Sequence, residues 1–235
     1  MNSLYLKLAK VKSSKKLRKF IQILRNIFGE ENPGTINFDF EKKPSRLFII
    51  QEIINKKKFR SYLEIGTFKN EVFSNIVCEK KIGVDPFSGG THRMTSDEFF
   101  SKYENKFDCI FIDGLHHYDQ VIKDINNSLK RINENGIILL HDCLPKNMDA
   151  QAIPRTVVEW NGDVWKALVN MRTKKNLDCY TCYADHGLGI ILKRPNRNLL
   201  NLKVSNFKKL KYVDFYNDYK NLMNLIEYDQ LKNLI

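Results

Sequence analysis

One stretch of the sequence, Phe107–Asp142, constrains the fold more than any other. It opens with a run that is apolar on both faces, as is typical of a strand covered on both sides of a sheet. Apolar side chains then recur at helical spacing, with charged side chains on the opposite face. Asn135-Gly136 predicts a chain reversal, and residues 137–140 form a second apolar strand. This order predicts a βαβ crossover, which joins two parallel strands by a right-handed connection.

Polar side chains gather where each of these two predicted strands ends. Parallel neighbours end at the same edge of a sheet, and in open α/β sheets this carboxyl edge binds ligands. Two carboxylates and two or three imidazoles are therefore expected to face one crevice. For any one of them alone, the alternative is a loop cap or a solvated histidine. The residues are Asp113, Gly114, His116 and His117 after the first strand, and His141 and Asp142 after the second.

Strand-like and helix-like segments alternate along most of the chain, which predicts a doubly wound, mostly parallel α/β sheet. Further strands are predicted at residues 62–66 and 81–85. Residues 177–183 and 187–193, joined by a short polar turn, predict an antiparallel C-terminal hairpin at the sheet edge. The predicted helices include residues 44–57, 71–76, 95–103 and 215–234.

Charge is unevenly distributed along the 235 residues, whose net charge is +12. Residues 1–29 carry eight Lys/Arg and no acidic residue, whereas residues 30–195 are close to neutral. The excess of basic charge therefore lies mainly in an N-terminal arm and not in the centre of the chain. A near-neutral central domain is not a polyanion groove, so no nucleic-acid partner is expected.

The basic arm contains apolar residues at helical spacing within residues 4–28, which predicts an amphipathic helix. Such a helix is expected to pack on the domain or on a second subunit of a homo-oligomer. The alternative is a peripheral contact with an anionic membrane surface.

Hydrophobic residues make up 43% of the chain, enough for a sizeable core, and no run of eighteen apolar residues predicts a membrane span. The N-terminus also lacks the long apolar segment and cleavage site of a secretory signal. Five cysteines, an odd number, suit a reducing cytoplasm. Cys179 and Cys182 lie three apart in a strand-like run and so point to opposite faces, which argues against a shared metal or disulfide.

A second group of polar residues follows the strands predicted at 62–66 and 81–85. Glu64-Ile-Gly66 allows a tight turn and close approach of the backbone to a ligand. Asp85, about twenty residues on, is placed to accept hydrogen bonds from two ribose hydroxyls. Lys69-Asn70 stands where a dinucleotide site requires another glycine, so pyrophosphate binding loses support. These features favour a nucleoside cofactor, and S-adenosylmethionine fits because a nearby carboxylate could face its cationic end.

Four segments in this order and spacing resemble the class I S-adenosylmethionine-dependent methyltransferases. They are S-Y-L-E-I-G-T-F-K-N, K-I-G-V-D-P, F-D-C-I-F-I-D-G-L-H-H-Y and G-I-I-L-L-H-D. The resemblance covers about residues 45–195 and points to the small O-methyltransferase-like group associated with glycan and natural-product pathways. It implies a seven-stranded, Rossmann-like sheet whose last strands form the hairpin, with helical N- and C-terminal extensions. It also implies that residues 45–195 are an S-adenosylmethionine-binding catalytic domain. Residues 1–44 would then be a basic N-terminal arm, and residues 196–235 a C-terminal extension packed on or beside the core.

The resemblance also implies roles for individual residues. Glu64 and Gly66 would lie beside the methionine part of the cofactor, Asp85 on the ribose, and Asp97 near the adenine. Asp113 and His116 would lie where cofactor meets substrate. The full set of expected cofactor-binding residues is Glu64, Gly66, Thr67, Asp85, Pro86, Asp97, Asp113 and Gly114.

The expected reaction is O-methylation of a sugar, nucleotide sugar or other small hydroxylated metabolite, an acceptor class implied by the resemblance. His116 is our first candidate for the base that removes the hydroxyl proton, and His141 is the second, beside Asp142. An alternative is a divalent cation such as Mg²⁺ on Asp113 and Asp142. His141 stands where metal-dependent relatives often carry a second acid, which weakens that alternative.

Two other function classes compete with an enzyme of this kind. One is a non-catalytic methyltransferase-like binding module that works through its basic arms. The other is a nucleotide-dependent oxidoreductase, which the missing glycines disfavour. Binding of S-adenosylhomocysteine or of NAD(H) would distinguish among the three.

Overall fold

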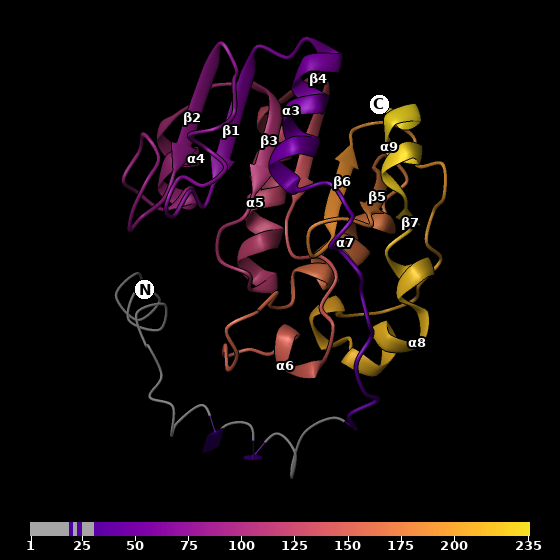
Figure 1. The fold of residues 1–235 in the computed structure, drawn as a ribbon. Coiled ribbons are helices and arrows are strands. Elements are labelled where there is room, and N and C mark those ends of the chain that lie inside the picture. Colours follow the sequence, from indigo (N-terminus) through magenta and orange to yellow (C-terminus); the bar gives the residue numbers. More distant parts are fainter. Residues whose placement is uncertain (1–18, 21–22, 25–30) are drawn as a thin grey trace.

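The computed structural model describes residues 19–20, 23–24 and 31–235, and a seven-stranded sheet forms the centre of this part (Figure 1). The strand order is β2-β1-β3-β4-β6-β5-β7. The first four strands in this order are parallel, β6 runs antiparallel to β4 and β5, and β7 is parallel to β5. This arrangement confirms the predicted fold class. The strands are β1 (Ser61–Ile65), β2 (Lys80–Val84), β3 (Phe107–Ile112), β4 (Ile132–Leu140), β5 (Asp178–Cys182), β6 (Leu188–Leu192) and β7 (Leu225–Ile226).

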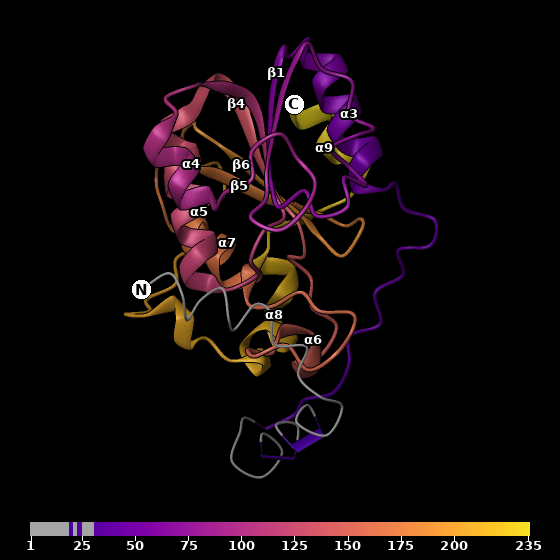
Figure 2. The same ribbon diagram turned by 90° about the vertical axis from the view of Figure 1, so that its left-hand side faces the viewer.

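Helices cover both faces of the sheet, as Figure 2 shows from the side. Side chains alternate across β3, so that Ile110 packs with α4, α5 and α7 on one face, while Phe111 packs with α3 and α9 on the other. Strands buried on both faces explain the continuous apolar runs in the sequence. The helices are α3 (Arg46–Lys57), α4 (Ser96–Lys102), α5 (Tyr118–Arg131), α6 (Met148–Gln151), α7 (Val164–Arg172), η1 (Phe207–Lys209), α8 (Tyr212–Leu222) and α9 (Tyr228–Leu234).

Helix α3 illustrates how local sequence signals define an element. The Ser45 side chain accepts a hydrogen bond from the Phe48 amide and so caps the first turn. Four isoleucines of one helical face are buried against the sheet. Lys58, with a φ of 54°, ends the helix in the left-handed conformation. The Ser45 cap fixes the start of the helix and therefore the position of Arg46, its first residue.

The helix predicted at residues 71–76 is wrong, because the structure has only turns there. The ammonium group of Lys81 donates to the carbonyl oxygens of Phe73, Ser74 and Ile76 at 2.8, 3.3 and 2.9 Å. In a continuing helix, those carbonyls would accept from amides four residues later. The Val77 amide instead donates to the side chain of Gln51. Two helical bonds remain, from the Ser74 amide to Asn70 and from the Ile76 amide to Val72, but bonds from other elements replace those that would continue the helix.

The chain reversal predicted at Asn135-Gly136 is also wrong, since both residues lie within β4. The strand starts directly after α5, at Ile132, and pairs with β3 on both sides of the predicted turn. Asn135 has a φ of 62°, and the register with β3 shifts between Phe107 and Cys109. The Asn-Gly pair thus accommodates an irregularity in the strand rather than a reversal.

The C-terminal region differs from the sequence prediction in two respects. The single helix predicted at 215–234 is divided into α8 and α9 by β7. Strand β7 pairs with the outer side of β5, so the hairpin does not form the edge of the sheet. The side chain of Asn224 donates to the carbonyl of Cys179 at 3.0 Å and helps to hold β7 in place. The seventh strand therefore comes from residues 196–235.

The predicted amphipathic helix within residues 4–28 lies outside the described residues, apart from 19–20 and 23–24. Among the residues that the structure describes, no helix is long and apolar enough to span a membrane. All five cysteines are free thiols, and both Cys179 and Cys182 are buried.

Candidate active site

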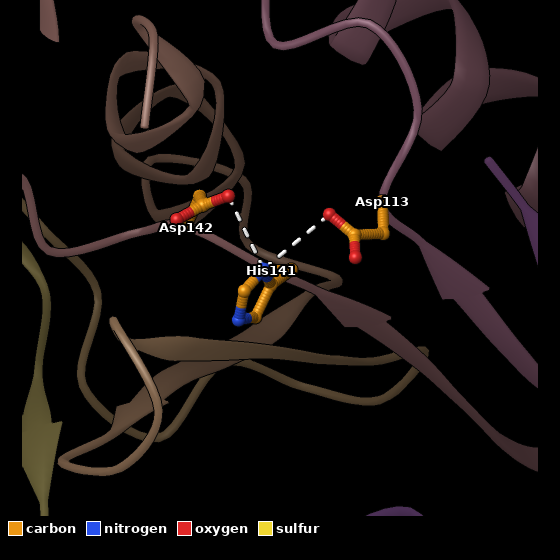
Figure 3. Close-up of side chains that lie close together, drawn as sticks. All are labelled: Asp113, His141 and Asp142. Carbon is orange, nitrogen blue, oxygen red and sulfur yellow. Dashed lines mark ion pairs between the residues drawn. The ribbon is translucent and has the colours of Figure 1, made fainter. Parts of the chain in front are cut away.

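Four side chains predicted to share a crevice lie together beyond the carboxyl ends of β3 and β4. Asp113 follows β3 directly, and its carboxylate lies beside the rings of both His116 and His141. Asp142, two residues after β4, lies beside the same two rings. Figure 3 shows His141 between the two carboxylates. We call these four residues, Asp113, His116, His141 and Asp142, the His/Asp cluster.

Each nitrogen of the His116 ring faces a different carboxylate. Nε2 lies 3.3 Å from Asp113 Oδ1, and Nδ1 lies 3.4 Å from Asp142 Oδ2. The ring also stacks on Trp160, with centroids 5.2 Å apart and planes inclined by 17°. His116 is thus held in one orientation by groups from three segments.

His141 is more deeply buried, with 7% of its side chain exposed. Its Nδ1 lies 3.3 Å from Asp113 Oδ1 and 3.2 Å from Asp142 Oδ2. Its Nε2 lies 3.3 Å from Asp185 Oδ1. The imidazole therefore bridges the two strand-end carboxylates and a third acid from the β5–β6 turn.

Three residues that the sequence analysis did not include complete the site. The Arg46 amide and guanidinium both donate to Asp185, with distances of 2.6 and 3.2 Å. The Arg46 Nε lies 3.8 Å from Asp113 Oδ2. Asn161 donates through Nδ2 to Asp142 Oδ1 at 2.8 Å. The signal for Asp185 was its place in a hairpin turn next to β4, whereas Arg46 and Asn161 carry no local signal.

Charges in this site compensate one another. Burial alone would raise the pKa of Asp113, but His141 and His116 outweigh it and hold this pKa well below its usual range. Burial is also outweighed at Asp185, whose pKa His141 and Arg46 lower. The carboxylates in turn raise the pKa of His116 and, more strongly, that of His141, against the opposing effect of burial. The site is thus a buried ionic network in which opposite charges are paired.

His117, also predicted to face the crevice, lies outside the cluster. It is the residue before α5, and burial lowers the pKa of its imidazole. Its ring centroid is 6.0 Å from that of Trp160, and neither ring nitrogen pairs with a cluster carboxylate among the described contacts. The two adjacent histidines therefore have different environments.

The end of β1 adjoins the His/Asp cluster through its backbone. Gly66 has a φ of 91°, and a Cβ atom at this position would lie 2.2 Å from the carbonyl oxygen of Asp113. Only glycine fits such an approach. Glu64 is almost fully buried and accepts a 2.6 Å hydrogen bond from the Tyr62 hydroxyl. Burial raises the pKa of the Glu64 carboxyl to about 7.

Asp85, at the end of β2, organises the loops around it. Its Oδ2 accepts from the Phe68 amide at 2.9 Å, and its Oδ1 accepts from the amides of Phe87 and Ser88 at 2.7 and 2.9 Å. The Gly90 amide donates a further hydrogen bond, of 2.6 Å, to the side chain of Asn70. The segment after β1 and the segment after β2 are therefore tied together by side-chain-to-backbone bonds.

The other predicted cofactor residues are distributed around these loops. Thr67 is buried and donates to the Ser88 carbonyl at 3.3 Å, while Pro86 is half-buried. Gly114 follows Asp113 and leaves ordinary contact distance, 3.4 Å, to the Ile65 side chain. Asp97, on α4, faces α5 and pairs with Gln120 and Lys123. The structure therefore gives Asp97 a contact between two helices, away from the His/Asp cluster.

Asp113, His141 and Asp142 could together hold a metal ion. Each offers one ligand atom, and these atoms all lie within 4.8 Å of one another. The donor set is two carboxylate oxygens and one imidazole nitrogen, which fits a divalent cation with further positions left for water or substrate. Hard Mg²⁺ prefers oxygen ligands, so the nitrogen makes the set less suited to it.

Part of the chain that carries the His/Asp cluster is similar in sequence to known proteins. A family model described as a methyltransferase domain matches residues 37–143, which include β1 to β4 and the whole His/Asp cluster. An uncharacterized protein of Acanthamoeba polyphaga mimivirus is 29% identical over 138 residues. That match covers 45% of this chain and 62% of the viral protein, so the chain spans less than two thirds of its relative.

Solved methyltransferases show a more distant likeness. An SAH-bound methyltransferase of Podospora anserina is 15% identical to this chain, with a TM-score of 0.47. The match covers 66% of this chain and 81% of the Podospora protein. An O-methyltransferase of Bacillus cereus in complex with SAH is 11% identical to this chain, with a TM-score of 0.47. That match covers 81% of this chain and 96% of the Bacillus protein.

The resemblance expected from the sequence is therefore confirmed by the family match over residues 37–143. Those residues include the strand ends that carry the site, and the seven-stranded sheet has the expected parallel and antiparallel parts. Over those residues, slightly less than half of the chain, the sequence is similar to a methyltransferase domain.

Proposed function

We propose that this protein is an S-adenosylmethionine-dependent O-methyltransferase that acts on a sugar, nucleotide sugar or other small hydroxylated metabolite. The observation that carries the proposal is the direct contact between two strand ends. The turn at Gly66, where the cofactor is expected, touches the backbone of Asp113, which belongs to the His/Asp cluster. A methyl donor and a proton-accepting group are needed side by side, and this contact supports such an arrangement.

The bound cofactor would supply an activated methyl group on its sulfonium. The protein must then align the acceptor oxygen and remove its proton. We assign proton acceptance to the neutral form of the His116 imidazole, which Asp142 and Asp113 make a stronger base by raising its pKa. Asp113 and Asp142 lie beside its two nitrogens, so the imidazolium formed by proton uptake is stabilised on both sides. Stacking on Trp160 keeps the ring from turning away during the transfer.

Substitution of His116 tests this assignment. His116→Ala should lower kcat by about 10²–10⁴ with little change in the affinity for S-adenosylhomocysteine, because only the proton acceptor is removed. His117→Ala is a matched control, since this neighbouring imidazole lies outside the cluster. Its kcat should stay within a few-fold of the wild-type value. EDTA should leave the wild-type rate nearly unchanged.

A metal-dependent reaction is a second candidate, favoured by the convergence of Asp113, His141 and Asp142 on one point. A divalent cation held there would lower the pKa of the acceptor hydroxyl and orient it. In that case EDTA abolishes activity, a divalent ion restores it, and His116→Ala stays active. That combination of results would reverse the assignment of His116 as the base.

Cofactor binding distinguishes a methyltransferase from the other function classes. Isothermal titration should show binding of S-adenosylhomocysteine and none of NAD(H). A chain that binds the cofactor yet consumes none, across nucleotide sugars and glycans with and without Mg²⁺, would instead be a non-catalytic binding module.

A further inference from the structure

We propose that Asp185 is a positioning residue that directs Nδ1 of His141 toward Asp113 and Asp142. The resulting site would select a first-row transition ion in the Fe²⁺ to Zn²⁺ range over Mg²⁺. This inference rests on the proposed function only for the location of the site, because ion binding can be measured without cofactor or acceptor.

The contacts of His141 determine which of its nitrogens faces the cluster. Nε2 lies 3.3 Å from Asp185 Oδ1, and an ionised carboxylate can only accept hydrogen bonds. Nε2 therefore carries the hydrogen in this contact. In the neutral ring, the lone pair is then on Nδ1, which lies 3.3 and 3.2 Å from oxygens of Asp113 and Asp142. The nitrogen that can bind a metal ion thus points at the two carboxylates.

Asp185 is itself fixed by several contacts that do not involve His141. The Arg46 amide donates to its Oδ2 at 2.6 Å, and the guanidinium donates to its Oδ1 at 3.2 Å. The β5–β6 turn that carries Asp185 is bonded to the segment after β4, since the Leu144 amide donates to the carbonyl of His186 at 2.9 Å. Asp185 is therefore a fixed acceptor that imposes one ring orientation on His141. Acceptors of this kind are worth 10–100-fold in metal affinity at other sites.

The two carboxylates are also oriented toward a common point. Asn161 donates a hydrogen bond to Oδ1 of Asp142 at 2.8 Å, and Oδ2 of the same carboxylate faces His141. The Arg46 Nε lies 3.8 Å from Oδ2 of Asp113, and Oδ1 of that carboxylate faces the same His141 ring. Two oxygens and one nitrogen thus converge. Imidazole suits Fe²⁺, Ni²⁺ and Zn²⁺, whereas Mg²⁺ binds sets of oxygen ligands.

Titration of the full-length chain with Co²⁺ and with Mg²⁺, without cofactor, tests the selectivity. Co²⁺ is the probe because it lies within the expected range and has useful spectra. Wild-type protein should bind Co²⁺ at least about tenfold more tightly than Mg²⁺. His141→Asp supplies a third carboxylate and should reverse this preference. His141→Gln should weaken Co²⁺ binding without raising the affinity for Mg²⁺, and circular dichroism should show that both variants are folded.

Asp185→Asn tests the positioning role, because asparagine tolerates the left-handed backbone of this residue, whose φ is 42°. It should weaken Co²⁺ binding by about 10–100-fold and leave the affinity for S-adenosylhomocysteine within about twofold. The matched control is Glu79→Gln, which removes a carboxylate that pairs with Arg60 near the start of β2. This control should bind Co²⁺ as the wild type does.

Proton NMR of the Co²⁺-loaded protein gives a readout that a purely structural role would not change. Coordination through Nδ1 should produce one strongly shifted imidazole N–H signal that disappears in D₂O. That signal should be absent in His141→Gln and present in His116→Gln. In Asp185→Asn it should exchange faster, because the hydrogen bond from Nε2 to the carboxylate is lost.

Three results would overturn the inference. They are no Co²⁺ binding by a folded chain, equal affinity for Co²⁺ and Mg²⁺, or unchanged Co²⁺ affinity in Asp185→Asn. The first would leave the cluster as an ionic network of side chains only. Parallel titration with S-adenosylhomocysteine keeps the two proposals separate, since loss of cofactor binding would contradict the proposed function and not the ion selectivity.

Discussion

Strand ends at the same edge of the sheet hold their carboxylates in two different ways. At the end of β2, Asp85 accepts three backbone hydrogen bonds from Phe68, Phe87 and Ser88. All of these residues lie within 20 positions of it in the chain. After β3 and β4, Asp113 and Asp142 pair instead with imidazole side chains. The first carboxylate shapes a backbone, whereas the other two belong to a network of side chains that can exchange protons or hold a cation.

This difference supports the proposed division of roles along the carboxyl edge. Backbone amides cannot change their charge, so the Asp85 region is suited to holding a fixed shape for a cofactor. Imidazoles can gain and lose protons, so the His/Asp cluster is suited to chemistry on the acceptor. The two regions meet at Gly66, whose backbone touches that of Asp113.

The largest expected effect comes from breaking the junction between the two regions. Gly66→Ala would place a Cβ atom 2.2 Å from the Asp113 carbonyl oxygen, on a backbone with a φ of 91°. The free energy of unfolding should fall by about 4 kcal/mol or more, because neither backbone can move aside without moving its strand end. Cofactor and ion binding should be lost together. Thermal unfolding and the two titrations measure these effects.

Gly114→Ala is the matched control for that substitution. Its Cβ atom would meet the Ile65 side chain at 3.4 Å, an ordinary contact distance. The free energy of unfolding should change by about 1 kcal/mol or less. Equal destabilisation by the two substitutions would show that the close approach at Gly66 does not join the regions.

A smaller effect, confined to one region, is expected from Asp85→Ala. The substitution leaves three backbone amides without their acceptor, at about 1–3 kcal/mol for each one that stays buried. Stability should fall by about 3 kcal/mol, and binding of S-adenosylhomocysteine should weaken. Co²⁺ binding at the His/Asp cluster should change little. A comparable loss in both titrations would mean that the two regions are not independent.

The smallest effect concerns Glu64, a buried carboxyl that accepts a hydrogen bond from the Tyr62 hydroxyl. Its pKa is about 7 in the folded protein, against an ordinary value of 4.5. A raised carboxyl pKa contributes stability below pH 4.5 that is lost as the pH rises through 7. Between pH 5 and 7 this loss is about 2 kcal/mol, since a pKa difference of one corresponds to about 1.4 kcal/mol.

Glu64→Gln should remove this pH dependence, because the amide stays neutral and can still accept from the Tyr62 hydroxyl. Urea unfolding of both proteins at pH 5 and pH 7 measures the difference. The advantage of the variant over the wild type should grow as the pH rises. A constant difference across this range would show that Glu64 is already ionised at pH 5 in the folded protein.

Local sequence patterns determined the main elements of the fold. The apolar run of β3, the helical spacing of α5 and the Ser45 cap of α3 depend on contacts within a few residues, so they can be read from the chain. The position of Asp113 and Asp142 at one edge follows from the parallel order of their strands. The same logic gave the turn at Gly66, where the backbone has to approach another strand.

The tertiary structure alone decided the contacts that cross between distant segments. Where a helix was predicted, the Lys81 ammonium group donates hydrogen bonds to backbone carbonyls, and the segment forms turns. Strand β7 extends the sheet beyond the hairpin. Arg46, Asn161 and Asp185 join the His/Asp cluster from three separate places in the chain. Their roles depend on which groups lie within 3–4 Å after folding, and no spacing along the sequence encodes that distance. The strand ends therefore place the site, while packing between remote segments determines which nitrogen of His141 faces it.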